Sequence, residues 1–556
     1  MTDKYVVGLD FGTLSGRAAV VRVDDGELVG TAVCEYPHAV MDTKLTAAGG
    51  QTLPPDFALQ DPGDYLEALY ATVPAAVEAS GVDPADIIGV GLDFTSATVV
   101  AAKADGTPVC ALPQFAGNPH AWVKLWKHHG AVEQADRIVE VAVARGEEWL
   151  RRYGGVLNSE MLLPKVAETL ERAPEVYAAT DVFCEAMDWL TWHLTGRLTF
   201  AAGSSGYKRI LQNGRYPSRE FLRQVNPGLE NVYDEKMNAP VLPLGENVGG
   251  LRAEAAERLG LPAGIAVASG NIDAHVTGPA VRGVEDGVMT AIMGTSVCYL
   301  LSWPDPVPVP GIFGIVDGGI VDGSWGFEAG QTAAGDIFAW FVDSCVPAGY
   351  KAEADELGIP VHELLTRKCE DQPVGAHGLV ALDWHNGNRS TLMDAQLSGL
   401  MLGQTLTTTP EDQYRALLES CAFGARTIID AFVSVGIDIK ELVVAGGLTK
   451  NRLFMRILSD VCRRPLSVGT ADQPGALGSA IFAAVAAGRY TDVKDASAAM
   501  GSKEEDVYLP DETRADRYDQ LYKEYSALYD YFGRGANEVM HRLKRVRAQA
   551  RAPIGG

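Results

Sequence analysis

The sequence lacks the features that mark a membrane protein, a disulfide-bonded scaffold or a P-loop protein. No apolar run approaches the roughly 18 residues that a membrane-spanning helix needs. None of the eight cysteines forms a C-x-x-C pair, and the ten histidines show no metal-ligand spacing, so neither a zinc knuckle nor a disulfide framework is predicted. No G-x-x-x-x-G-K-[ST] motif occurs, and no G-x-G-x-x-G follows the first predicted strand. P-loop kinases and dinucleotide-dependent dehydrogenases are therefore disfavoured.

Positive charge is also scarce. The 556 residues include 47 Lys and Arg against 72 Asp and Glu, a formal net charge of −25 at pH 7. Such a surface repels nucleic acid, so no nucleic-acid or membrane partner is expected. The N-terminus lacks the basic and then apolar layout of a signal peptide, which favours a cytoplasmic protein. The basic end, from His541 to Arg551, is expected to be a solvated helical tail.

A strand–turn–strand pattern recurs along the chain. Tyr5–Val23 predicts a β-hairpin around a glycine turn, Ile87–Ala102 predicts a second strand–turn–strand unit, and the opening pattern returns at Val288–Leu301. Two copies, starting near residues 5 and 288, predict two similar domains with a cleft between them, which is a preferred place for a small-molecule site. Helices are expected over Pro62–Ser80 with an interruption at Pro74, over Gln331–Val342 and over Pro410–Val435.

The first glycine turn has the composition of a phosphate-binding loop. Backbone N–H groups of a tight turn point at an anion, and glycine permits its close approach. The segment Asp10–Arg17 supplies Gly12, the hydroxyls of Thr13 and Ser15, and the Arg17 guanidinium. The Asp10 carboxylate just before the turn can hold the metal that phosphoryl transfer requires. When the segment is taken alone, an ordinary β-hairpin with a D-x-G turn is the better interpretation.

Two later segments strengthen the phosphate-loop interpretation. Gly294-Thr295-Ser296 lies in a matching strand–turn–strand context, so two loops can clasp a triphosphate from both sides. In the segment Leu442–Asn451, Gly446 and Gly447 follow an apolar strand and leave room for a nucleoside, although a plain strand-to-helix connection explains them too. The order and spacing of the three segments predict an ATP site.

Asp273 is the candidate for acid–base chemistry. It follows the short apolar strand Gly264–Ser269, just before the second copy of the pattern begins, which places it at the predicted cleft. A carboxylate there can accept the proton of a hydroxyl group while the γ-phosphoryl group is transferred. A helix N-cap is the alternative role for Asp273, and the two roles are compatible.

Taken together, the three segments resemble the superfamily of actin, sugar kinases and heat-shock ATPases. Over nearly its whole length the chain is similar to the FGGY carbohydrate kinases. Ser398–Gly403 followed by Tyr414–Glu419 resembles the C-terminal signature of that family, with departures at Gln404 and Leu417. Glu160–Lys165 keeps the Pro and Lys of the N-terminal signature but lacks the tryptophan that usually follows. These departures point to a divergent branch.

Four further segments resemble the branch of this family that phosphorylates L-ribulose. They are Gln60–Tyr65, the insert Pro113–Lys127, Gly203–Lys208 and Gly270–His275. The resemblance implies transfer of the γ-phosphoryl group of ATP, with Mg²⁺, to the 5-hydroxyl of L-ribulose, a step of L-arabinose catabolism. A kinase for another ketopentose, D-ribulose or xylulose, is the nearest alternative. An actin-like ATPase without a sugar substrate is a further one.

The resemblance also implies the fold. It is an α/β fold with two ribonuclease H-like, actin-like ATPase domains. Residues 1–280 would form an N-terminal domain with the sugar site, and residues 281–495 a C-terminal domain with the second phosphate loop. Residues 496–556 would form a helical C-terminal extension. The oligomeric state is not defined by the sequence, and a homodimer is compatible with it.

Site roles carry over by the same resemblance. Asp273 would be the general base, and Lys208 and Glu328 would bind the sugar. Ala97 would line the sugar pocket, where a small residue leaves room for a ketopentose. Without the family, Lys208 would be interpreted as a surface lysine and Glu328 as a solvated carboxylate on a β-edge. Asp10 would bind the metal. The ATP contacts would come from Gly12, Thr13, Ser15, Arg17, Gly294, Thr295, Gly446, Gly447 and Asn451.

Overall fold

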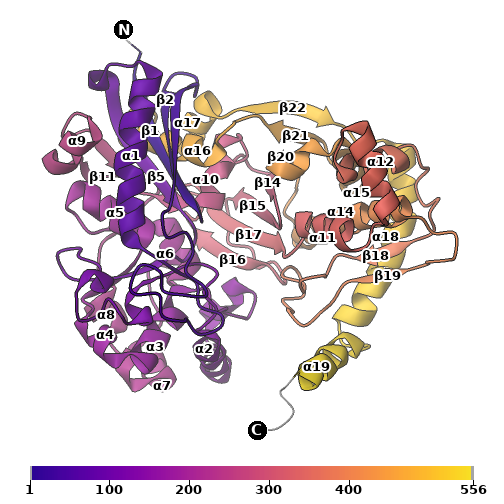
Figure 1. Cartoon of the computed structure of the whole chain (residues 1–556), viewed down its shortest axis with the longest axis horizontal. Helices are drawn as coiled ribbons and strands as arrows, with labels where there is room; N and C mark the ends of the chain where they lie inside the picture. The colour runs from indigo at the N-terminus through magenta and orange to yellow at the C-terminus, as the bar shows by residue number, and fades with distance from the viewer. Residues whose placement is uncertain (1–2, 552–556) are drawn as a thin grey trace.

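The computed structural model describes residues 3–551 and shows two α/β lobes side by side (Figure 1). A seven-stranded sheet forms the centre of each lobe. The first sheet contains β1 (Tyr5–Phe11), β2 (Ser15–Arg22), β3 (Leu28–Glu35), β5 (Ile87–Phe94), β11 (Asn247–Gly250), β12 (Ala266–Ala268) and β13 (Asn271–Ile272). The second contains β14 (Val288–Met293), β15 (Val297–Trp303), β16 (Phe313–Asp317), β17 (Trp325–Gln331), β20 (Glu441–Ala445), β21 (Leu466–Gly469) and β22 (Lys503–Tyr508).

The two sheets repeat one pairing scheme. In the first, β1, β2 and β3 are antiparallel neighbours, and β5 pairs parallel to the other side of β1. In the second, β14, β15 and β17 are antiparallel neighbours, and β20 pairs parallel to the other side of β14. Each sheet continues with one more parallel strand and then an antiparallel one, β12 and β11 in the first and β21 and β22 in the second. The predicted duplication is confirmed at the level of strand order.

The predicted second strand–turn–strand unit is confirmed as β5, a turn and β6 (Val99–Ala102), but it is not a hairpin. β5 and β6 follow each other in sequence but do not pair, because β6 joins a separate four-stranded sheet. That sheet also contains β4 (Leu59–Gln60), β7 (Val123–Lys124) and β8 (Val182–Glu185). Around it, α2 (Val132–Arg145), α3 (Leu162–Arg172), α4 (Pro174–Ala179), α7 (Arg219–Val225) and α8 (Val232–Lys236) form a helical part of the first lobe with its own hydrophobic core.

Helix α16 (Pro474–Ala486) belongs in space to the first lobe although it comes late in the chain (Figure 1). It packs on β1 and β5, and its apolar residues lie in the same core as those of the first sheet. Glycines in β1 and β5 allow α16 to approach the sheet closely. A Cβ atom at Gly8 would lie 1.9 Å from the Ala476 carbonyl oxygen, and one at Gly91 would lie 2.1 Å from that of Ser479. α17 (Val493–Met500) extends the same core.

Two predicted helices differ in detail. α1 (Pro62–Ser80) runs without interruption through Pro74, so the helix tolerates the loss of one backbone donor there. The segment expected to begin a helix at Gln331 is still strand at that residue, and α11 (Gly335–Ser344) begins four residues later. The long predicted helix is confirmed as α14 (Pro410–Ser434), which begins at a capping box formed by Thr409 and Asp412.

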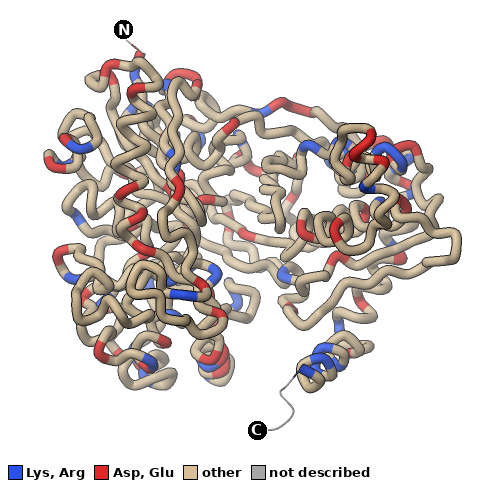
Figure 2. The backbone as a smooth tube through the Cα atoms, in the orientation of Figure 1, with Lys and Arg blue, Asp and Glu red and all other residues tan. Residues whose placement is uncertain are grey.

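The chain ends in two helices, α18 (Glu512–Gly533) and α19 (Val539–Arg551). α18 packs on the second lobe through Tyr518, Tyr525 and Tyr529. Lys and Arg gather on α19, whereas acidic residues are spread over both lobes (Figure 2). Within residues 3–551, no helix has both the length and the apolar composition needed to cross a membrane.

Candidate active site

The first predicted phosphate loop connects β1 to β2. Its turn closes with the Gly12 N–H donating to the Ser15 carbonyl oxygen at 3.0 Å. The Arg17 guanidinium, predicted to contact ATP, donates to the predicted metal ligand Asp10 at 2.8 Å. This pair keeps both groups at the loop. Thr13 and Leu14 at the tip of the turn are half-buried and exposed, respectively, so a phosphate can approach the turn from outside.

A buried side chain supports this loop from behind. The Gln60 amide donates to the Thr13 carbonyl oxygen at 2.8 Å, and the Tyr65 hydroxyl donates to the Gln60 side-chain oxygen at 2.7 Å. On the outer side, the indole N–H of the half-exposed Trp126 donates to the Thr13 hydroxyl at 3.2 Å. Gln60 and Trp126 lie in segments chosen for family resemblance, but the sequence assigns them no contact with the loop.

The second loop and the predicted nucleoside segment lie next to each other. β14 and β20 are parallel neighbours, so Gly294 and Gly446 leave the sheet at the same edge. Gly446 has a φ of +99°, and a Cβ atom there would lie 2.5 Å from the Met293 carbonyl oxygen, so only glycine fits this approach. Gly294, Thr295, Gly446 and Gly447 form an exposed, backbone-rich edge that can receive a nucleotide.

Thr295 and Asn451, both predicted to contact ATP, also make hydrogen bonds within the protein that the sequence does not predict. The Thr295 carbonyl oxygen accepts hydrogen bonds from the backbone N–H groups of Ala334 and Asp336, at 2.8 and 3.2 Å, which ties the loop to the start of α11. The Asn451 side chain caps α15 (Arg452–Cys462) by accepting from the Phe454 N–H at 3.0 Å, and it donates to the Thr366 hydroxyl at 3.3 Å. A contact of Asn451 with ATP therefore stays a prediction.

Asp273 is the first residue of α10 (Asp273–Ala280), directly after β13. Its Oδ1 accepts from the Ala274 N–H at 2.7 Å, which fixes the orientation of the carboxylate. Burial, with the carboxylates of Asp10 and Glu328, raises the pKa of Asp273 to about 7, although the Ala274 N–H and the Lys208 ammonium oppose the rise. A carboxylate with this pKa can take up a proton near neutral pH.

Glu328 lies in the interior of the second sheet, not on a β-edge, because β17 pairs with both β15 and β16. Its carboxylate accepts from Arg389 at 2.6 Å and contacts His275 Nε2 at 3.2 Å, and the Lys208 ammonium lies 4.0 Å away. Burial alone would raise the pKa of Glu328, but Lys208, Arg389 and His275 together hold it below its ordinary value. Glu328 is therefore an ionised acceptor inside the site.

Lys208 is likewise buried and not at the surface. It ends α6 (Ala202–Lys208), and its ammonium lies over the Phe313 ring at 5.3 Å from the ring centroid. Ala97, predicted to line the sugar pocket, is buried in the turn between β5 and β6, and its N–H donates to Glu185 Oε2 at 3.1 Å. The structure thus places Lys208 and Glu328 4.0 Å apart, and the charges of Lys208, Glu328 and Asp10 all affect the pKa of Asp273.

Asp93 and Arg389 are site residues that the sequence analysis missed. Asp93 is fully buried in β5, directly across from Asp10 in β1, and its Oδ2 accepts from the Ser479 hydroxyl of α16 at 2.7 Å. Burial and the nearby Asp10 carboxylate raise the pKa of Asp93 well above its ordinary value. Arg389 lies in the long connection between β18 (Val380–Leu382) and β19 (Leu400–Leu402), where no motif marks it.

The chemistry of this site fits a hard divalent cation. Mg²⁺ is usually held by one or two carboxylates together with substrate phosphates. Asp10 provides such a carboxylate at the loop, and the buried Asp93 Oδ1 beside it has no hydrogen-bond partner among the described residues. Within residues 3–551, the one preformed group of three metal-ligand side chains is His38, Asp61 and Asp64. The 2.8 Å contact of His38 with Asp64 explains that group as an ion pair.

Comparison with known proteins identifies the architecture. The model of the N-terminal domain of the FGGY family of carbohydrate kinases matches residues 5–278, and the model of its C-terminal domain matches residues 289–487. A ribulokinase of Mycolicibacterium smegmatis is 52% identical, covering 98% of this chain and 97% of its own. A ribulokinase of Geobacillus thermodenitrificans is 47% identical and covers 99% of both chains.

Solved structures agree in fold. The crystal structure of xylulose kinase from Rhodospirillum rubrum superposes with a TM-score of 0.78 at 22% identity, covering 95% of this chain and 98% of that one. A glycerol kinase from Plasmodium falciparum, solved with ADP, gives a TM-score of 0.72 at 16% identity, covering 94% and 98%. At these identities the likeness concerns the fold alone.

Proposed function

The chain belongs to the FGGY family of carbohydrate kinases, and we propose that it transfers the γ-phosphoryl group of ATP to the 5-hydroxyl of L-ribulose. The observation that carries the choice of sugar is the full-length likeness to ribulokinases, 52% and 47% identical, which extends through both lobes. The geometry fits this activity, because a carboxylate suited to proton transfer lies beside buried sugar-binding groups and a phosphate loop.

Asp273 is the proposed general base. A sugar hydroxyl is a weak nucleophile and must lose its proton as its oxygen bonds to phosphorus. The Ala274 N–H holds Asp273 Oδ1, so Oδ2 is the oxygen that we assign to the substrate hydroxyl. The proton passes from the 5-hydroxyl to this oxygen, the oxygen–phosphorus bond forms, and ADP leaves with the electron pair of the broken bond.

The buried charges on the sugar side orient the substrate. Lys208 donates hydrogen bonds to sugar oxygens, and Glu328 accepts from sugar hydroxyls. Arg389 donates to Glu328 Oε1 at 2.6 Å and His275 contacts Oε2 at 3.2 Å, so the carboxylate needs little reorganisation when the sugar binds. The small side chain of Ala97 forms part of the pocket wall.

ATP is assigned to the two loops and the glycine pair. Backbone N–H groups around Gly12 and Thr295 would bind phosphate oxygens, and Gly446 and Gly447 would lie against the nucleoside. Asp10 would hold Mg²⁺, with Asp93 behind it. Bound there, the ion would offset the negative charge of the transferred group.

Release of ADP tests this proposal. The purified protein is mixed with MgATP and, in parallel, with L-ribulose, D-ribulose, D-xylulose, glycerol or no acceptor. We expect ADP formation to depend on a ketopentose and to be most efficient, by kcat/KM, with L-ribulose. Higher efficiency with D-ribulose or D-xylulose would reassign the substrate within the family. Turnover that is equally fast without any acceptor would instead indicate an ATPase.

Location and assembly stay predictions at this point. The sequence favours a cytoplasmic protein, and a homodimer is compatible with it. Light scattering on the purified protein measures its mass directly against the 59.3 kDa of one chain. A single species at twice that mass would support the dimer.

A further inference from the structure

Lys165 is a fully buried lysine whose charge serves two backbone carbonyls. Its side chain extends from α3, and the ammonium donates to the Ala97 and Leu125 carbonyl oxygens, each at 2.7 Å. Burial lowers the pKa of Lys165 to about 7, a cost that the nearby carboxylates of Glu160 and Glu185 reduce. Burying a charged group costs free energy unless the group is paired and hydrogen-bonded. A lysine buried here to bind two backbone carbonyls therefore suggests that those carbonyls must be held in place.

The first carbonyl belongs to a residue in an unfavourable backbone conformation. Ala97 has a φ of +52°, in the left-handed region where a Cβ atom crowds the following carbonyl. Both backbone polar groups of Ala97 are held, the N–H by Glu185 at 3.1 Å and the carbonyl by Lys165. Removing either contact leaves the turn free to relax toward an ordinary φ, which would move the pocket wall.

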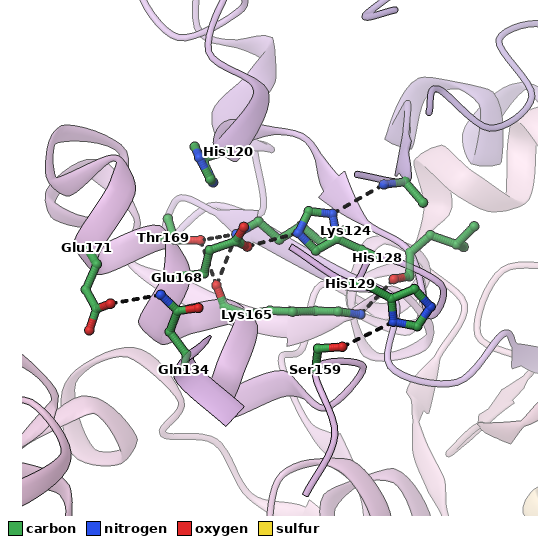
Figure 3. A network of polar contacts seen from close by, with 12 residues as sticks. His120, Lys124, His128, His129, Gln134, Ser159, Lys165, Glu168, Thr169 and Glu171 are labelled. Atoms are coloured by element: carbon green, nitrogen blue, oxygen red, sulfur yellow. Dashed lines mark hydrogen bonds and ion pairs between the residues drawn. The ribbon is translucent and has the colours of Figure 1, made fainter. Parts of the chain in front are cut away.

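The second carbonyl leads to the phosphate loop. Leu125 directly precedes Trp126, whose indole N–H donates to the Thr13 hydroxyl at 3.2 Å. Figure 3 shows the Lys165 side chain passing below His128 toward His129. Its ammonium donates to the Leu125 carbonyl oxygen at 2.7 Å. One ammonium group therefore connects the turn of the sugar pocket with a segment that touches the phosphate loop.

The neighbouring Lys124 provides an internal comparison (Figure 3). It is also buried, but its ammonium donates to Glu168 at 2.6 Å, to the Thr169 hydroxyl at 2.7 Å and to the Lys165 carbonyl oxygen at 3.1 Å. His128 completes this group through Glu168 at 2.9 Å. All of these bonds stay inside the helical part, so Lys124 has the burial and charge of Lys165 without its link to Ala97.

We propose that Lys165 is a positioning residue for the sugar pocket, which holds the Ala97 turn in its left-handed conformation through the carbonyl. The inference rests on the proposed function in one respect, the assignment of Ala97 to the sugar pocket. It gives a physical reason for the lysine of the Glu160–Lys165 segment. The lysine does not touch the substrate; it acts through the backbone of a residue that does.

Steady-state kinetics of Lys165→Met and Lys124→Met test the proposal. We expect Lys165→Met to raise the KM for the sugar at least 10-fold, with the KM for ATP changed less than 3-fold, at a temperature where the variant remains folded. Lys124→Met should lower the thermal midpoint at least as much and leave the sugar KM within 2-fold of the wild type. Equal sugar KM values for the two variants would overturn the proposal, because a general loss of packing would affect both alike.

A double variant asks whether the effect passes through Ala97. Glycine adopts a positive φ without steric cost, so Ala97→Gly should reduce the effect of Lys165→Met on the sugar KM to less than 3-fold. An undiminished effect in the Ala97→Gly background would refute the proposed route. If Lys165→Met does not fold, Lys165→Arg replaces it, because arginine keeps the charge and bulk but displaces the donor, and the same rise in sugar KM is expected.

Failure of the proposed function would look different. If the wild-type protein prefers another ketopentose, all variants are compared with that sugar, and the inference is tested unchanged. If the wild type shows no sugar-dependent turnover at all, the proposed function fails. In that case the inference is tested by sugar binding alone. It holds if L-ribulose raises the thermal midpoint of the wild type and raises that of Lys165→Met less, and it fails otherwise.

Discussion

At the scale of single residues, the site is a set of buried charges that adjust each other. Glu328 stays ionised because Arg389, Lys208 and His275 surround it. Burial and two other carboxylates raise the pKa of Asp273 to about 7. The same fold thus gives one carboxylate the properties of a fixed acceptor and another those of a base. The difference lies in the neighbouring charges, which come from distant parts of the chain.

Replacing Asp273 by Asn should abolish most of the activity. The amide cannot take up the hydroxyl proton, so kcat should fall about 10²–10⁴-fold, the usual contribution of a general base. The ATP dissociation constant, measured by calorimetry, should stay within about 3-fold, because Asp273 belongs to the sugar side. Asp305→Asn, at an exposed aspartate, is the matched control and should behave as wild type. Full activity of Asp273→Asn would disprove the base assignment.

The pH profile reports the same group. Asp273 has a pKa of about 7 in the free protein and must be ionised to accept a proton. The kcat/KM for the sugar should therefore fall about tenfold per pH unit below pH 7 and level off above it. The measurement is a series of initial rates between pH 5 and pH 9 at a fixed ionic strength. A profile that is flat down to pH 5 would show that no group with this pKa limits the reaction.

At the scale of elements, the close packing of helix α16 on the first sheet requires glycines in the strands beneath it. Gly91→Ala would put a Cβ atom 2.1 Å from the Ser479 carbonyl oxygen. Because this oxygen belongs to the backbone of α16, the helix itself would have to shift to remove the clash. We expect the first lobe to lose about 1–3 kcal/mol of stability and the thermal midpoint to fall. Gly117→Ala is the control, since nothing lies within 4 Å of a Cβ atom there. Equal thermal midpoints for the two variants would contradict the packing argument.

The elements also show what the sequence could predict. The sequence predicts the turns at Gly12 and Gly294 because a hairpin and its glycine lie within a few neighbouring residues. It does not predict the role of Arg389, because this residue lies 61 residues from its partner Glu328 in a connection without a periodic pattern. The contact between Ser479 and Asp93 spans 386 residues, and only the tertiary fold brings them together. Contacts of this kind leave no local pattern in the sequence, whereas a turn within a hairpin does.

At the scale of the whole molecule, the lobes do not follow the order of the chain. The family models divide it near residue 280, yet α16 and α17 complete the core of the first lobe from beyond residue 470. The predicted boundaries at residues 280 and 495 therefore remain to be tested as folding units. The first sheet needs a helix from the second half of the chain to cover β1 and β5.

A fragment ending at residue 280 should not fold by itself. Without α16, the faces of β1 and β5 that it covers would be exposed to water. We expect the fragment to bind a hydrophobic dye and to melt without a cooperative transition. A second fragment, in which a flexible linker joins residues 470–502 to residue 280, should recover a cooperative transition. Cooperative melting of the shorter fragment alone would show that α16 is dispensable.

The late arrival of α16 also sets an order of events during synthesis. The ribosome finishes α10 at residue 280 but does not finish α17 until residue 500. At about 5–20 residues per second, the nascent first lobe waits roughly 10–45 s for the helices that close it. During that interval one face of its sheet has no native cover, and chaperones have time to bind it. A protein built this way matures as one unit, after the last of its two lobes has left the ribosome.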